Sequence, residues 1–153
     1  MISHFESLFA KVALLAVFQS IVASIGGNVG TQSLAMNVRA IALGEVSIRE
    51  AWRPLSRQIV TGIILGLAVG AVVGLGVYLW KGTAYLGVII FLAVLANIII
   101  AVIVGTLIPL SMKALKLDPA LASSVLVTAI TDSLGFLIFL GLAAIFISYL
   151  EVT

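Results

Sequence analysis

Four long apolar stretches dominate the pattern of hydrophobic and polar positions, and short polar segments separate them. The stretches cover residues 10–40, 57–80, 84–111 and 119–150. A bilayer core of about 30 Å is crossed by about 20 helical residues, so each stretch is long enough for a transmembrane helix. Transmembrane β-strands would appear as alternating segments of about ten residues, and none are visible. The pattern predicts an all-α, polytopic membrane protein with four transmembrane helices in a single domain.

The composition supports this class of protein. Hydrophobic residues make up 63% of the 153 residues and charged residues 9%, whereas a soluble domain has about a quarter of its residues charged. The chain has no cysteine, which excludes disulfides, thiolate metal sites and cysteine nucleophiles. Its net charge of +2 gives no indication of nucleic-acid binding. We expect the lipid bilayer to be the main environment of the chain.

Lysine and arginine are distributed unevenly between the polar segments. Six lie in the segments around the ends of the first and third stretches, 39–57 and 113–118 (Arg39, Arg49, Arg53, Arg57, Lys113 and Lys116), and two lie elsewhere (Lys11 and Lys81). Because cytoplasmic loops are enriched in these residues, segments 39–57 and 113–118 are predicted to be cytoplasmic and both termini to lie outside the inner (cell) membrane. An outside N-terminus without a signal peptide suggests a further helix upstream.

Local signals predict two helix ends. Asp118–Pro119 fits an N-cap followed by proline, so the last helix is predicted to begin at residue 119. Ser47–Glu50 has the spacing of a capping box, so a short surface helix is predicted over residues 48–53, ending before Pro54.

Glycines recur every four residues in the second stretch, at Gly62, Gly66, Gly70 and Gly74. Such a stripe lets helix backbones approach closely in lipid, where apolar burial does not favour helix over lipid contact. Two interpretations remain open, static packing and a sliding or gating surface.

One acidic residue lies inside the last stretch. At 1.5 Å per residue, Asp132 is about 21 Å along the helix from Asp118. A charge at mid-membrane costs about 2.5–3.5 kcal/mol on insertion scales, so the side chain should face protein or water. Ser124 and Thr128 precede it at helical spacing and make one face polar. This face predicts a water-filled cation pathway, and the alternative is a protonated Asp132 hydrogen-bonded within the bundle.

Enzyme chemistry lacks the residues that it needs. An intramembrane aspartyl protease requires a second acid at the depth of Asp132, and a serine hydrolase requires a buried base, whereas the single histidine is the N-terminal His4. A zinc site lacks histidine and cysteine ligands.

Mg²⁺ prefers oxygen ligands and keeps several waters, although sodium ions or protons fit a lone acid equally well. One carboxylate per chain is too little for a cage, but a two-fold dimer would bring two together.

The segment Ser24–Ser33, SIGGNVGTQS, interrupts the first stretch with glycines and neutral polar side chains. Its three glycines weaken the helix and let another backbone approach, while Asn28 and Gln32 supply oxygen atoms at that level. We expect a kinked or non-helical segment that lines a cavity, with close packing as the alternative.

These residues resemble the MgtE family of magnesium channels and transporters. The resemblance rests on Gly26–Ser33 followed by Arg39–Gly44, on Asp118–Ser124 followed by Thr128 and Thr131–Gly135, on Gly105–Pro109, and on Phe5–Glu6. It covers nearly the whole chain. It implies a homodimer with a pore at the subunit interface, lined by segment 24–33 and the helix that carries Asp132.

The resemblance also implies roles for individual residues. Asp132 would be the main acid that recognises hydrated Mg²⁺. The other residues expected on the pore are Ser124, Thr128, Asn28 and Gln32, while Asp118 would join a regulatory metal site. Mg²⁺ is therefore expected as the transported ion and as a regulatory ion.

The chain departs from the family pattern in several places. Family members usually have a further membrane helix before the first one here, and cytoplasmic CBS domains that sense magnesium. Ser124 and Val125 replace a frequent asparagine–proline pair, and Val102 replaces an asparagine, with Asn97 lying upstream. Because the sensor domains are absent, a separate regulatory subunit is an expected partner besides a second copy of the chain.

The predicted function is therefore transport of Mg²⁺ or a related divalent cation through a homodimeric, channel-like pore, without enzyme activity. Two alternatives remain open. One is an exchanger coupled to sodium or protons, and the other is a non-transporting membrane subunit that packs against a partner through the glycine stripe.

Overall fold

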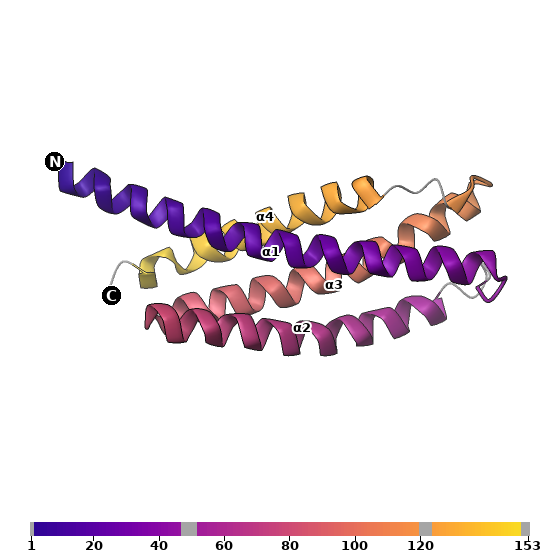
Figure 1. Ribbon diagram of the computed structural model, residues 1–153, viewed down its shortest axis with the longest axis horizontal. Coiled ribbons are helices and arrows are strands. Elements are labelled where there is room, and N and C mark those ends of the chain that lie inside the picture. The colour runs from indigo at the N-terminus through magenta and orange to yellow at the C-terminus, as the bar shows by residue number, and fades with distance from the viewer. Residues whose placement is uncertain (1, 47–51, 120–123, 151–153) are drawn as a thin grey trace.

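The protein forms four long helices. The computed structural model describes residues 2–46, 52–119 and 124–150, with side chains described between residues 16 and 145 of these ranges. The helices are α1 (Ile2–Ala42), α2 (Trp52–Lys81), α3 (Ala84–Ala114) and α4 (Ser124–Leu150), and the described ranges contain no β-strand (Figure 1). Each predicted span overlaps one helix, so the predicted all-α fold is confirmed.

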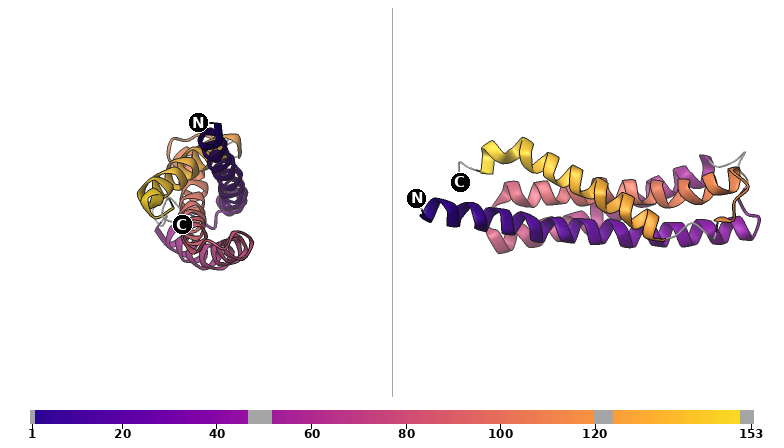
Figure 2. Two further views of the ribbon diagram at one scale, coloured as in Figure 1. Left: turned by 90° about the vertical axis from the view of Figure 1, so that its left-hand side faces the viewer. Right: turned by 90° about the horizontal axis from the view of Figure 1, so that it is seen from above.

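Helix α3 lies at the centre of the bundle. Helices α1, α2 and α4 all pack against α3, and α1 also packs against α4. The end-on view in Figure 2 shows α2 on one side of α3 and the α1–α4 pair on the other. Half of the most apolar part of α3 is buried, compared with 22% for α2 and for α4. This arrangement places α1 and α4 side by side, where the predicted ion site lies.

Three helices are long and apolar enough to cross a membrane by length and composition. They are Trp52–Lys81, Ala84–Ala114 and the part of α4 from Ser124 to Ile145. The described part of α1 is not among them, and it carries the polar side chains of segment 24–33 in its middle. The membrane assignment therefore rests on α2, α3 and α4, and a transmembrane position for α1 stays a prediction.

The two basic connections lie at the same end of the bundle. Figure 1 shows the α1–α2 and α3–α4 connections at one end, and both termini with the α2–α3 turn at the other. The described residues of segments 39–57 and 113–118 therefore belong to one side, and that this side is cytoplasmic stays a prediction.

Helices α1 and α3 end in the same type of cap. Gly44 and Lys116 have positive φ angles of 73° and 59°, and the N–H of the residue that follows each donates to a carbonyl oxygen of the last helical turn, at 3.0 and 2.9 Å. This left-handed cap satisfies carbonyl groups that the helix itself leaves open. Glycine adopts the angle freely, which accounts for Gly44 two residues after the end of α1.

Two predicted helix ends differ from the structure or lie outside its described part. The prediction that a helix ends before Pro54 is wrong, because α2 begins at Trp52 and continues through Pro54. Proline fits in a first turn, where its missing N–H would have no intrahelical acceptor. Residues 48–51 of the predicted surface helix and residues 120–123 lie outside the described ranges.

The glycine stripe of α2 packs against α3. All four glycines are buried, and a Cβ built on each of them would meet Val102, Leu95, Phe91 or Gly87 of α3. This supports the static-packing interpretation. Since α3 of the same chain covers the stripe, the stripe is not a surface for a partner.

Candidate functional site

The acid of α4 lies against the glycine segment of α1. A Cβ built on Gly27 would lie 3.4 Å from Asp132 Oδ1 and 3.4 Å from Thr128 Cγ2. Because Gly27 has no side chain, the side chains of Asp132 and Thr128 approach the backbone of α1 directly. Both are half-buried, so they lie at the edge of the α1–α4 contact.

The remaining predicted pore residues on these helices are exposed. Asn28 and Gln32 lie four residues apart on α1, and Ser124 lies four residues before Thr128 on α4. A spacing of four places each set along one helix face. We call Asn28, Gln32, Ser124, Thr128 and Asp132 together the polar seam. Their oxygen atoms are open to an ion or to its water shell.

The Asp132 carboxylate forms no hydrogen bond or ion pair with another described residue. The alternative of a carboxyl that is hydrogen-bonded within the bundle therefore has no support in the described part of the chain.

The level of Gly27 and Asp132 lies near the middle of the bundle. Gly26 adjoins Gly27 on α1, and Gly135 follows Asp132 by one helical turn. A Cβ on either glycine would collide with Asn97, which lies near the middle of α3. This position agrees with the predicted depth of Asp132.

A single chain supplies one carboxylate at this level. Within the described ranges, no group of three or more histidine, cysteine, aspartate or glutamate residues could hold a metal ion. Asp118, the predicted regulatory ligand, is exposed in the connection before α4 rather than in the seam. An ion in the seam of one chain would therefore keep most of its waters, as Mg²⁺ commonly does.

The expected non-helical break in segment 24–33 is wrong, because α1 is helical throughout this segment. The glycines instead allow close approach, as the alternative interpretation predicted. A Cβ on Gly30 would lie 2.8 Å from Val127 of α4, and a Cβ on Gly105 of α3 would lie 2.5 Å from the Gly30 carbonyl oxygen. The helix hydrogen bonds are kept, and the missing side chains bring α1, α3 and α4 together.

Asn97 is a residue of this region that the sequence reasoning did not assign a role. Its side chain is fully buried, and Nδ2 donates to the Val22 carbonyl oxygen of α1 at 2.8 Å. Its Oδ1 has no hydrogen-bond partner among the described residues. The side chain fits between Gly26 and Gly135: a Cβ on Gly26 would collide with its Nδ2, and a Cβ on Gly135 would lie 2.8 Å from the same atom. One signal was available, since Asn97 is the only polar side chain in residues 86–105.

A second set of buried polar side chains joins α1 to α3, between Asn97 and the C-terminal end of α3. Asn37 Nδ2 donates to the Ser33 carbonyl oxygen at 2.8 Å and to Thr106 Oγ1 at 3.2 Å. Thr106 Oγ1 donates to the Val102 carbonyl oxygen at 2.7 Å. Polar contacts between helices in lipid stabilise by roughly 0.6–2 kcal/mol each. Together they hold α1 in one register on α3.

Asn97→Ala is expected to lower the stability of the bundle by about 1–3 kcal/mol, because it removes the bond to Val22 and leaves a cavity. The thermal midpoint of the purified protein in a neutral detergent measures this. Ser20→Ala is the matched control, since Ser20 is exposed and bonds only within α1. Equal midpoints for the two variants would contradict a stabilising role of Asn97.

The fold and the polar seam together define a class of protein. It is a polytopic α-helical membrane protein with a carboxylate at mid-bundle, where α4 contacts α1. Comparison with models of protein families identifies one family. Residues 19–142 match the MgtE family, described as divalent cation transporter. The match covers more than half of the chain, and the chain belongs to the MgtE family. This is a family of transporters, as the lack of enzyme residues led us to expect.

Three relatives are similar over most of this chain. The magnesium transporters MgtE of Bacillus subtilis and Enterococcus faecalis are each 36% identical, over 95% and 97% of this chain. The magnesium transporter MgtE of Thermus thermophilus is 32% identical over 91% of this chain. The matches cover 32%, 33% and 31% of these relatives, so the chain spans about a third of their length.

Proposed function

We propose that this chain forms a membrane pathway for Mg²⁺, in which the hydrated ion is recognised by Asp132 in the polar seam. The observation that carries the proposal is the position of Asp132 Oδ1 against Gly27, with no partner among the described residues. A carboxylate at mid-membrane is costly, so such a residue marks a functional site by default. The family match and the three relatives named as magnesium transporters support Mg²⁺ as the ion.

The pathway is proposed to form between two copies of the chain. One seam offers one carboxylate, whereas two seams that face each other across a two-fold axis offer two. The exposed Asn28, Gln32 and Ser124 would then face the ion's water shell from both chains. Amide and hydroxyl oxygens accept hydrogen bonds from coordinated water, so the ion can pass without losing its inner waters.

Regulation and orientation are further parts of the proposal. We place the basic end of the bundle in the cytoplasm, where Asp118 is exposed for a second, regulatory Mg²⁺. A separate regulatory subunit would bind at the same end. Asp118→Ala is then expected to change the response to internal Mg²⁺ without abolishing transport.

The direct test is Mg²⁺ uptake into liposomes that contain the purified chain, followed with an internal magnesium-sensitive dye. We expect uptake driven by the Mg²⁺ gradient and the membrane potential alone. Uptake that requires an opposing sodium or pH gradient would instead establish a coupled exchanger. No uptake under any gradient would overturn the proposal for this chain by itself.

A further inference from the structure

A polar cavity of about 450 Å³ lies away from the seam, between the C-terminal end of α1 and the first turns of α2. Its lining residues are Met36, Asn37, Ala40, Glu45, Val46, Arg53, Pro54, Arg57, Gln58 and Thr61. The volume lies within the range of about 300–1,000 Å³ that is typical of small-molecule sites. Since α1 and α2 both pack mainly against α3 and contact each other only weakly, the cavity lies in the space between their ends.

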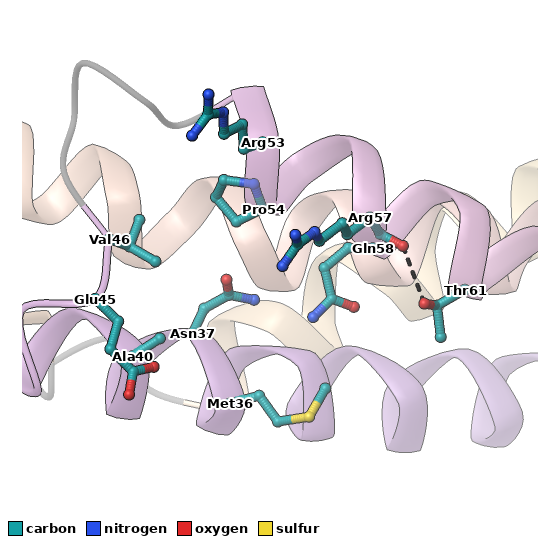
Figure 3. A pocket seen from close by; sticks show the side chains of 10 residues that line it. All are labelled: Met36, Asn37, Ala40, Glu45, Val46, Arg53, Pro54, Arg57, Gln58 and Thr61. Atoms are coloured by element: carbon teal, nitrogen blue, oxygen red, sulfur yellow. Dashed lines mark hydrogen bonds between the residues drawn. The ribbon is translucent and has the colours of Figure 1, made fainter.

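Positive charge dominates this cavity. Arg53 and Arg57 line it with two guanidinium groups against the single carboxylate of Glu45. Figure 3 shows Arg57 reaching into the space between the helices, Arg53 at the rim, and Glu45 pointing away from both. Neither guanidinium forms an ion pair with a described residue.

Neutral polar groups complete the lining. Asn37 is 4% exposed, and its Nδ2 donates to the Ser33 carbonyl oxygen, to Ser33 Oγ and to Thr106 Oγ1, so its hydrogen bonds to α1 and α3 use the amide nitrogen. Figure 3 shows Asn37 extending from α1 and Gln58 extending from α2 into the same space. The cavity thus combines the guanidinium donors of Arg53 and Arg57, the amide of Gln58 and the amide oxygen of Asn37 as an acceptor.

We propose that this cavity binds the phosphate group of an anionic ligand. Guanidinium groups bind phosphate oxygens through paired, charge-assisted hydrogen bonds. The acceptor oxygen of Asn37 suits a hydroxyl beside the phosphate, as in a glycerol headgroup. The cavity opens at the end of the bundle, next to the exposed Trp52, so an anionic lipid and a soluble phosphate can both reach it. The bound group would bridge α1 and α2, and its binding does not depend on ion transport.

The test measures binding to the purified chain in a neutral detergent, by native mass spectrometry and by the shift of the thermal midpoint. Phosphatidylglycerol, phosphatidylcholine and inorganic phosphate are the three probes. We expect one tight phosphatidylglycerol per chain and an affinity that falls at least about tenfold in R53Q/R57Q, since each arginine near an anionic lipid contributes about fivefold. Lys81→Gln, at the other end of α2, is the matched control and should keep full affinity.

The Arg57→Lys variant distinguishes a specific phosphate site from nonspecific attraction to positive surface charge. Lysine keeps the positive charge but lacks the paired donors of arginine. If the site recognises phosphate through these donors, its affinity for phosphatidylglycerol should fall several-fold. If phosphatidylglycerol binds equally well in the presence of inorganic phosphate, the ligand is a lipid. If inorganic phosphate competes with it, the ligand is a soluble phosphate compound. Both results support the site. Binding that is unchanged in R53Q/R57Q, equally reduced in Lys81→Gln, or fully kept in Arg57→Lys would overturn it.

Discussion

Asp132→Ala should lower Mg²⁺ uptake into liposomes by about tenfold to a hundredfold. The variant removes the one carboxylate of the polar seam and leaves Thr128 and Gly27 in place. Hydrogen bonds to a charged group stabilise by about 1.5–3 kcal/mol, and about 1.4 kcal/mol corresponds to a factor of ten in affinity. Asp132→Asn keeps an oxygen acceptor without the charge, so we expect its uptake to lie between that of Asp132→Ala and that of the unchanged protein.

Ser133→Ala is the matched control for Asp132. Ser133 is the next residue on α4, is exposed, and donates only to the Ala129 carbonyl oxygen of its own helix. Its uptake should equal that of the unchanged protein. The oligomeric state of each variant is measured by size-exclusion chromatography with light scattering. Full uptake by Asp132→Ala would remove Asp132 from its proposed role.

Gly105→Ala should destabilise the bundle by about 1–3 kcal/mol, as other overpacked sites do. A Cβ at this position would lie 2.5 Å from the Gly30 carbonyl oxygen, 2.8 Å from Ser33 Cβ and 3.0 Å from the Leu34 nitrogen. Two of these three atoms belong to the backbone of α1, so α1 must move away from α3. The displacement would also shift Gly27 relative to Asp132, so Mg²⁺ uptake should fall together with the thermal midpoint.

Gly76→Ala provides the contrast. A Cβ on Gly76 of α2 would meet nothing within 4 Å, and alanine is favoured over glycine inside a helix by about 0.5–1 kcal/mol. Its thermal midpoint in detergent should equal or exceed that of the unchanged protein. If Gly105→Ala were as stable as Gly76→Ala, the close approach of α1 and α3 would be contradicted.

Several features of the fold could be predicted because they depend on local sequence. The apolar stretches predicted the four helices, since lipid requires a hydrogen-bonded backbone and sufficient apolar length. The glycine spacing in α2 predicted close packing, and α3 occupies that stripe. The predicted helix end before Pro54 was wrong because proline interrupts a helix interior but fits its first turn.

The candidate site was predicted in part. The cost of a charge in lipid singled out Asp132, and helical spacing grouped it with Ser124 and Thr128. Segment 24–33 was recognised as special, but its glycines indicated a break, whereas they provide contact surfaces on a continuous helix. Glycine has the same low helix propensity in both cases, so propensity alone does not distinguish them.

By itself, the sequence determined that this is a helical membrane protein of the MgtE family with one acidic residue in its last apolar stretch. These properties depend on composition, on spacing along one helix and on motifs that are read locally. Only the tertiary structure decided that α3 is central, that Asn97 lies between Gly26 and Gly135, and that Asp132 lies against Gly27. Such contacts join residues far apart in the chain, and which helices meet depends on how the faces of all four fit together.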